Sequence, residues 1–102
     1  MENATSYVIP EEVLTAHLQD EAVLLHLGSK RYFRLNSTGA WIWRGLERGY
    51  STNELVAHLC ERFEVGTEEA ADAVEEQLSR LRELGLVVPK DGSPAEDRLP
   101  RW

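Results

Sequence analysis

The chain has 102 residues, a length typical of a single domain. Eleven Lys and Arg stand against 18 Asp and Glu, and the resulting net charge of −7 argues against binding to nucleic-acid phosphates through a basic face. The single cysteine excludes an internal disulfide and no apolar run reaches the roughly 20 residues of a membrane span, so we expect a cytoplasmic protein.

Three short strands are predicted in the first third of the chain. Apolar and polar residues alternate over residues 13–18, 22–27 and 31–35, as they do in half-buried strands. Polar breaks of hairpin length separate these segments, which predicts an antiparallel meander. The third strand would then lie at an edge of the sheet, and its alternation points Phe33 and Leu35 toward the core.

After the third strand the apolar residues adopt helical spacing. The first helix is predicted from a cap at Asn36 or Ser37 to about residue 48. Ser51 and Glu54 match a capping box, in which each side chain accepts a hydrogen bond from the other's backbone amide. A second helix therefore begins at Thr52 and packs close to the first.

A third helix is predicted to begin with Thr67 as its cap. Gly85 followed by Leu86 is a typical C-terminal signal, in which Leu86 folds back on Leu81 in a Schellman motif. The predicted fold is therefore α+β, with a three-stranded antiparallel sheet followed by three helices in a winged helix-turn-helix-like arrangement.

The end of the chain differs in composition from the part before it. Residues 90–102 hold prolines, mixed charges and few apolar side chains, so they have little to pack with. We expect a domain over residues 1–89 and a flexible tail over residues 90–102.

No pattern for catalysis, metal or cofactor binding is visible. His17, His26 and His58 match no zinc-binding spacing, and Cys60 has no second thiol near it in sequence. Cys60 and His58 are two residues apart on a helix and point in different directions, so they cannot share a proton. We therefore predict no catalytic residue, no metal and no cofactor, and we interpret Cys60 as a buried structural cysteine.

Winged-helix folds often bind DNA, and the third helix tests that possibility. Between residues 68 and 83 it carries six acids and two bases, a charge that would repel phosphate. A module that binds a polypeptide is the better interpretation. Two alternatives stay open: an acidic winged-helix regulatory protein that acts through protein contacts, and an unrecognised small enzyme or metal protein.

One segment resembles a known family. Residues 31–43 read Arg-Tyr-Phe-Arg-Leu-Asn-Ser-Thr-Gly-Ala-Trp-Ile-Trp, which is similar to the PqqD-like signature of a strand ending in Leu-Asn and a helix opening with Thr-Gly-Ala and an Ile-Trp pair. The resemblance continues through Ser51-Thr52, residues 63–65 and residues 81–86, and covers roughly residues 8–88. At Trp41 the family often has a polar residue instead.

The resemblance implies a function in peptide binding. PqqD-like domains are RiPP recognition elements, which bind the leader segment of a ribosomally made precursor peptide and bring it to modifying enzymes. A domain of this size is similar to the stand-alone leader-binding proteins of lasso-peptide pathways, which act beside a separate leader peptidase. The family binds its leader by strand addition beside the third strand, with leader side chains in a groove against the third helix.

Carried onto this sequence, the resemblance predicts a two-sided leader-binding site. Two alanines on the third helix leave room for a strand to lie close. Another interpretation is that Arg31 and Arg34 guard the strand edge against association. Trp41 lies off the apolar stripe of its helix and is predicted to contact the partner enzyme. The predicted leader-binding residues are Arg31, Tyr32, Phe33, Arg34 and Leu35 on the strand and Ala70, Ala73, Val74, Gln77, Leu78 and Leu81 on the helix.

Overall fold

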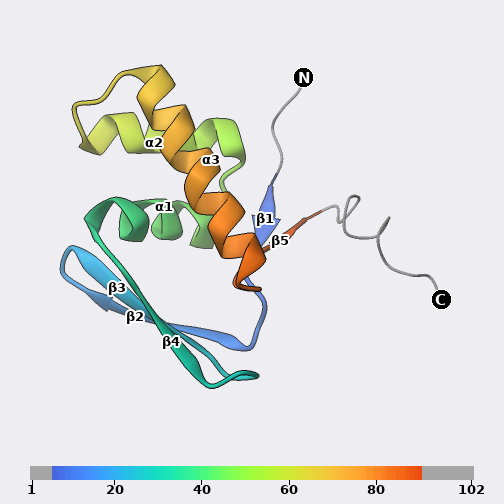
Figure 1. The fold of residues 1–102 in the computed structure, drawn as a ribbon. Coiled ribbons are helices and arrows are strands. Elements are labelled where there is room, and N and C mark those ends of the chain that lie inside the picture. Colours follow the sequence, from blue (N-terminus) through green and yellow to red (C-terminus); the bar gives the residue numbers. More distant parts are fainter. Residues whose placement is uncertain (1–5, 91–102) are drawn as a thin grey trace.

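An antiparallel meander forms one layer of the fold (Figure 1). The strands β2 (Val13–Leu18), β3 (Glu21–His26) and β4 (Arg31–Leu35) lie side by side in that order. The computed structural model describes residues 6–90, and within this range one edge of β4 pairs with β3 while the other pairs with no strand. The predicted edge position of the third strand is confirmed.

The pairing register decides which side chains of β4 face the helices. Phe33 lies opposite Leu24 and faces inward, where Leu24 is completely buried. Tyr32 lies opposite Leu25 on the outer face and is 71% exposed. Leu35 is buried, so the prediction that Phe33 and Leu35 point toward the core is confirmed.

Three helices follow the sheet, and the α+β fold class is the predicted one. They are α1 (Ser37–Glu47), α2 (Thr52–Arg62) and α3 (Thr67–Glu83). In Figure 1, α1 lies between the sheet and α2, and α3 runs from α2 down toward the end of the sheet. This descent brings the C-terminal half of α3 beside β4.

The helix ends follow local sequence signals, with one exception. The side-chain oxygen of Asn36 accepts a hydrogen bond from the amide of Gly39 at 2.9 Å, and Ser51 forms the predicted capping box with Glu54. The N-cap of α3, however, is Gly66 and not Thr67. Gly66 takes the extended cap conformation and its carbonyl accepts the amide of Ala70 at 2.9 Å, so Thr67 is already helical.

The C-terminal end of α3 adopts the predicted Schellman motif. Gly85 has φ of +76°, a left-handed conformation that a residue without a Cβ adopts readily. Its amide donates to the carbonyl of Arg82 at 3.0 Å, and the amide of Leu86 donates to that of Leu81 at 2.9 Å. The reversal buries Leu86 completely against the helix that it follows.

The core lies where α1 meets the sheet and the other two helices. Trp43 of α1 is its largest fully buried side chain, and the indole Nε1 donates to the hydroxyl of Thr15 on β2 at 3.0 Å. This bond satisfies a polar group that burial would otherwise leave without a partner. The other large side chains buried to the same degree are Leu24, Ile42, Leu55, Val74, Leu81, Leu86 and Val87.

A second, two-stranded sheet has no counterpart in the sequence predictions. β1 (Tyr7–Val8) pairs antiparallel with β5 (Val88–Pro89), and the amide of Lys90 donates to the carbonyl of Ser6 at 2.7 Å. Strands of two residues are too short to show an alternating pattern. Of the predicted tail, residues 91–102 lie outside the described range. No helix among residues 6–90 is long and apolar enough to cross a membrane.

Candidate functional site

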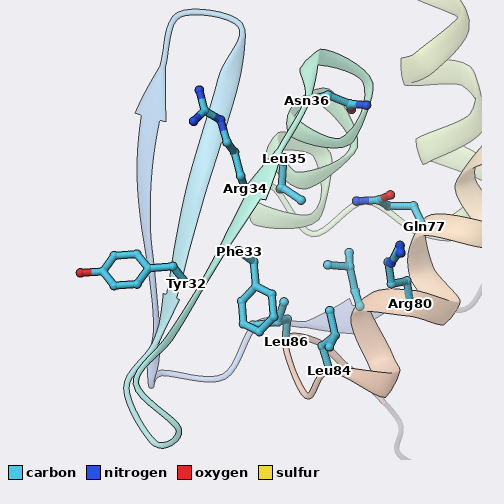
Figure 2. A pocket seen from close by; sticks show the side chains of 10 residues that line it. Tyr32, Phe33, Arg34, Leu35, Asn36, Gln77, Arg80, Leu84 and Leu86 are labelled. Atoms are coloured by element: carbon cyan, nitrogen blue, oxygen red, sulfur yellow. The ribbon is translucent and has the colours of Figure 1, made fainter.

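A groove runs between the unpaired edge of β4 and the C-terminal half of α3 (Figure 2). It is open to solvent and has a volume of about 530 Å³. Its walls come from elements far apart in the sequence, which only the folded chain brings together. The lining residues are Tyr32, Phe33, Arg34, Leu35, Asn36, Gln77, Arg80, Leu81, Leu84 and Leu86.

One end of the groove is apolar. Figure 2 shows Phe33 of β4 pointing toward Leu84 and Leu86, across the space between strand and helix. Phe33 and Leu84 are only partly buried against the core, so part of their apolar surface faces the groove. An apolar side chain of a bound peptide would gain free energy by covering this surface.

The other end of the groove is polar. Gln77 and Arg80 project from α3, and Asn36 lies where β4 passes into α1 (Figure 2). The amide Nε2 of Gln77 comes so near to α1 that a Cβ added at Gly39 would lie 3.0 Å from it. Gly39 therefore allows the close approach that places Gln77 at this end of the groove.

Two residues of β4 line the groove with their backbone and turn their side chains away. In Figure 2, Tyr32 and Arg34 point to the outer face of the sheet. The guanidinium of Arg34 donates there to Oε1 of Glu21 from Nη2 at 2.9 Å and from Nε at 3.2 Å. The edge of the strand consequently offers the groove backbone amides and carbonyls, which can pair with an added strand of many sequences.

The structure brings only part of the predicted helix residues to the groove. Gln77 and Leu81 line it. Ala70, Val74 and Leu78 are buried in the core, and Ala73 is partly buried against it. Ala70, Ala73 and Val74 belong to the N-terminal half of α3, which packs along α2 and not beside β4. Leu78 belongs to the C-terminal half, but its side chain is buried in the core.

Four lining residues were missed by the sequence predictions: Asn36, Arg80, Leu84 and Leu86. A signal for two of them was present. Gln77, Arg80 and Leu84 recur at intervals of three and four residues and so share one face of the helix. This face is the C-terminal continuation of the stripe that holds Ala70 and Ala73, the two alanines that were predicted to bind the leader. As leader-binding residues, all the predicted positions stay predictions.

Trp41 lies away from the groove and is held between α1 and α2. Its indole Nε1 donates to the carbonyl of His58 at 2.7 Å, and the two rings stack with centroids 4.3 Å apart. The guanidinium of Arg62 lies 5.0 Å from the centroid of the Trp41 ring. Trp41 is partly exposed and lines a separate polar hollow of about 200 Å³, together with Arg44 and Arg62.

The three histidines lie apart, each in a contact of its own. His17 is 3.0 Å from the carboxylate of Glu47, and His26 is 3.6 Å from that of Glu12. His58 is buried, and its Nε2 donates to the carbonyl of Trp41 at 3.1 Å. Among residues 6–90 no three His, Cys, Asp or Glu side chains come together as metal ligands would.

Burial lowers the pKa of His58 below its usual 6.5, because desolvation disfavours the charged imidazolium; the hydrogen bond to Trp41 opposes this shift. In the unfolded chain His58 takes up a proton at a higher pH than in the folded chain. The free energy of unfolding should therefore fall as the pH drops through 6.5 toward the lowered pKa. Urea unfolding on either side of pH 6.5 measures this loss. A His58→Gln variant should lose less stability over the same interval, and an equal loss would contradict the assignment.

Comparison with known proteins identifies the family. The family model described as coenzyme PQQ synthesis protein D (PqqD) matches residues 21–87, which is more than half of the chain. The chain belongs to the PqqD family. The resemblance seen in residues 31–43 is thereby confirmed. A search of the curated proteins found no match.

Two solved structures share this PqqD fold. TbiB1 in complex with the TbiA(beta) leader peptide is 34% identical, with a TM-score of 0.75 over 78% of this chain and 93% of that chain. A lasso peptide synthetase B1 complexed with the leader peptide is 28% identical, with a TM-score of 0.73 over 81% of this chain and 98% of that chain. Within the PqqD family, this chain is therefore similar to lasso-peptide proteins.

Proposed function

We propose that this chain binds the leader segment of a ribosomally made precursor peptide, in particular a lasso-peptide precursor. The observation that carries the proposal is the groove between β4 and α3, which combines an unpaired strand edge with an apolar pocket. The two solved relatives, both in complex with leader peptides, support it. No modification chemistry is needed for this function, and the chain contributes no catalytic group.

The leader is bound as an added strand beside β4. Backbone hydrogen bonds to the five-residue edge give affinity without selecting side chains. Every second leader side chain then enters the groove, where Phe33 and Leu35 face Leu81 and Leu84. Since a disordered leader loses conformational entropy on binding, we expect a Kd in the micromolar to high nanomolar range.

Titration calorimetry of the full chain with the TbiA(beta) leader peptide, and with the leader encoded beside this chain's own gene, tests binding. In NMR spectra the amide shifts should change along β4 and along the turn of α3 from Gln77 to Leu84. An affinity in the stated range with shifts confined to these elements is the expected result. Absence of saturable binding to both peptides, or shifts centred on α2, would contradict the proposed site.

Delivery is the second part of the proposal: the chain brings its leader to a separate leader peptidase or other modifying enzyme in the cytoplasm. Tethering makes the encounter of enzyme and substrate intramolecular, at effective concentrations of about millimolar for short linkers. Trp41 is the candidate contact with the enzyme, because it is partly exposed at a hollow separate from the leader groove. Leader and enzyme could then be bound at the same time.

A Trp41→Phe variant separates the two parts of the function. The change removes the hydrogen bond to His58 and the wider part of the ring, but it leaves β4 and α3 intact. We expect normal leader affinity and a reduced rate of leader cleavage by the partner peptidase. Cleavage at the wild-type rate by a folded variant would place the enzyme contact elsewhere.

A further inference from the structure

The polar end of the groove presents a cation within an acidic protein. The chain has a net charge of −7, yet none of the residues that line the groove is Asp or Glu. Arg80 lines this space from α3, next to Gln77 (Figure 2). Arg34, the other lining arginine, turns its charge to the outer face of the sheet and pairs there with Glu21 at 2.9 Å.

The guanidinium of Arg80 is free to bind a ligand. Among residues 6–90 it forms no ion pair, hydrogen bond or ring contact, whereas Arg62 pairs with Asp20 at 3.3 Å. Glu76 and Glu83 lie one turn from Arg80 on the same helix, but neither forms an ion pair with it nor lines the groove. No described side chain therefore competes with a ligand for a direct ion pair with Arg80.

The neighbours of Arg80 at this end are hydrogen-bond donors as well. Gln77 lies one helical turn earlier on the same face and contributes its amide. Asn36 uses its side-chain oxygen to accept the amide of Gly39, which leaves the NH₂ group as the part still able to bind. A guanidinium with two amide donors complements a carboxylate, which accepts several hydrogen bonds at once.

We infer that the groove selects leaders that carry one Asp or Glu facing Arg80, on the polar side of the apolar anchors. This inference rests on the proposed function. Side chains on one face of a strand recur every second residue, so the acid lies an even number of residues from an anchor. The overall charge of −7 repels acid-rich peptides. Selection is thus for a single carboxylate at a defined place.

Selection from a displayed library of random peptides, each long enough to span the five residues of β4, tests the inference. Wild-type protein, Arg80→Gln and Arg82→Gln are immobilised in parallel. Arg82 is the matched control, because the same charge is removed about 200° around the helix from Arg80, at a position that does not line the groove.

Peptides enriched on the wild type and on Arg82→Gln should share apolar residues at alternate positions and one acid at a constant offset. Peptides enriched on Arg80→Gln should keep the anchors and lose the acid. In the strongest wild-type binder, Glu→Gln at that offset should weaken binding to the wild type by about three- to tenfold and barely change binding to Arg80→Gln.

Anchored peptides without an enriched acid, or with the same acid enriched on Arg80→Gln, would overturn the inference while the proposed function stands. Failure to enrich anchored peptides on any of the three proteins would contradict the proposed function, and the inference with it. The two failures are therefore distinguishable.

Discussion

Replacing Phe33 with Ser should weaken leader binding by about 10- to 100-fold. The ring provides much of the apolar surface at one end of the groove, and it lies between β4 and the end of α3. Covering a side chain of this size is worth about 1.5–3 kcal/mol, and each 1.4 kcal/mol corresponds to tenfold in affinity. Titration calorimetry with a leader peptide that binds the wild-type chain measures the loss of affinity. Circular dichroism confirms that the variant is folded.

The matched comparison is Tyr32→Ser, one residue earlier on the same strand. Tyr32 is 71% exposed and its ring points to the opposite face of the sheet, so it meets the leader through its backbone. We expect this variant to lose less than about threefold in affinity, the effect of a single cross-strand contact. Equal losses for Tyr32 and Phe33 would show that the leader does not enter this groove.

Trp43→Ala should lower the free energy of unfolding by about 3–5 kcal/mol, the range for truncating a large buried aromatic side chain. Trp43 has no exposed surface and connects α1 to β2 through its bond to Thr15. A domain of this size has a total stability of only about 5–15 kcal/mol, so a substantial unfolded population is expected. Urea unfolding followed by far-UV circular dichroism measures the change.

A Trp43→Phe variant separates volume from hydrogen bonding. It keeps an aromatic ring in the core but leaves the hydroxyl of Thr15 without its indole partner. We expect an intermediate loss, about 1–3 kcal/mol, from the smaller ring and the lost hydrogen bond. If Trp43→Ala were as stable as Trp43→Phe, Trp43 would not be the centre of the core that the structure shows.

Short-range sequence signals were sufficient to predict most of the strands and helices. Alternation identified the three main strands, and Ser51 with Glu54 located the start of α2 at Thr52. Gly85 and Leu86 identified the Schellman motif that ends α3. These signals act over a few neighbouring residues, so the tertiary environment does not change them. The cap of α3 was displaced by one residue because Gly66 needs no side chain to begin the helix.

Two features depend on contacts between distant segments and had no local signal. β1 and β5 pair across almost the whole described chain, and each has only two residues. His58 is buried between Trp41 and Tyr50 through stacking and edge contacts that join α1, α2 and the connection between them. A histidine two residues from Cys60 gives no indication in the sequence of such a position.

The features of the groove also fall into those that the sequence predicts and those that depend on tertiary packing. The sequence alone determined that β4 is an edge and that Phe33 and Leu35 face inward, because residue spacing decides the face of a strand or helix. That α3 lies opposite them was implied by the family resemblance. The turn of α3 that meets β4 is decided by the angle at which the helix crosses α2 and descends past the sheet. That angle results from packing between distant side chains, so Arg80 and Leu84 entered the groove only in the tertiary structure, while Ala70 and Val74 went to the core.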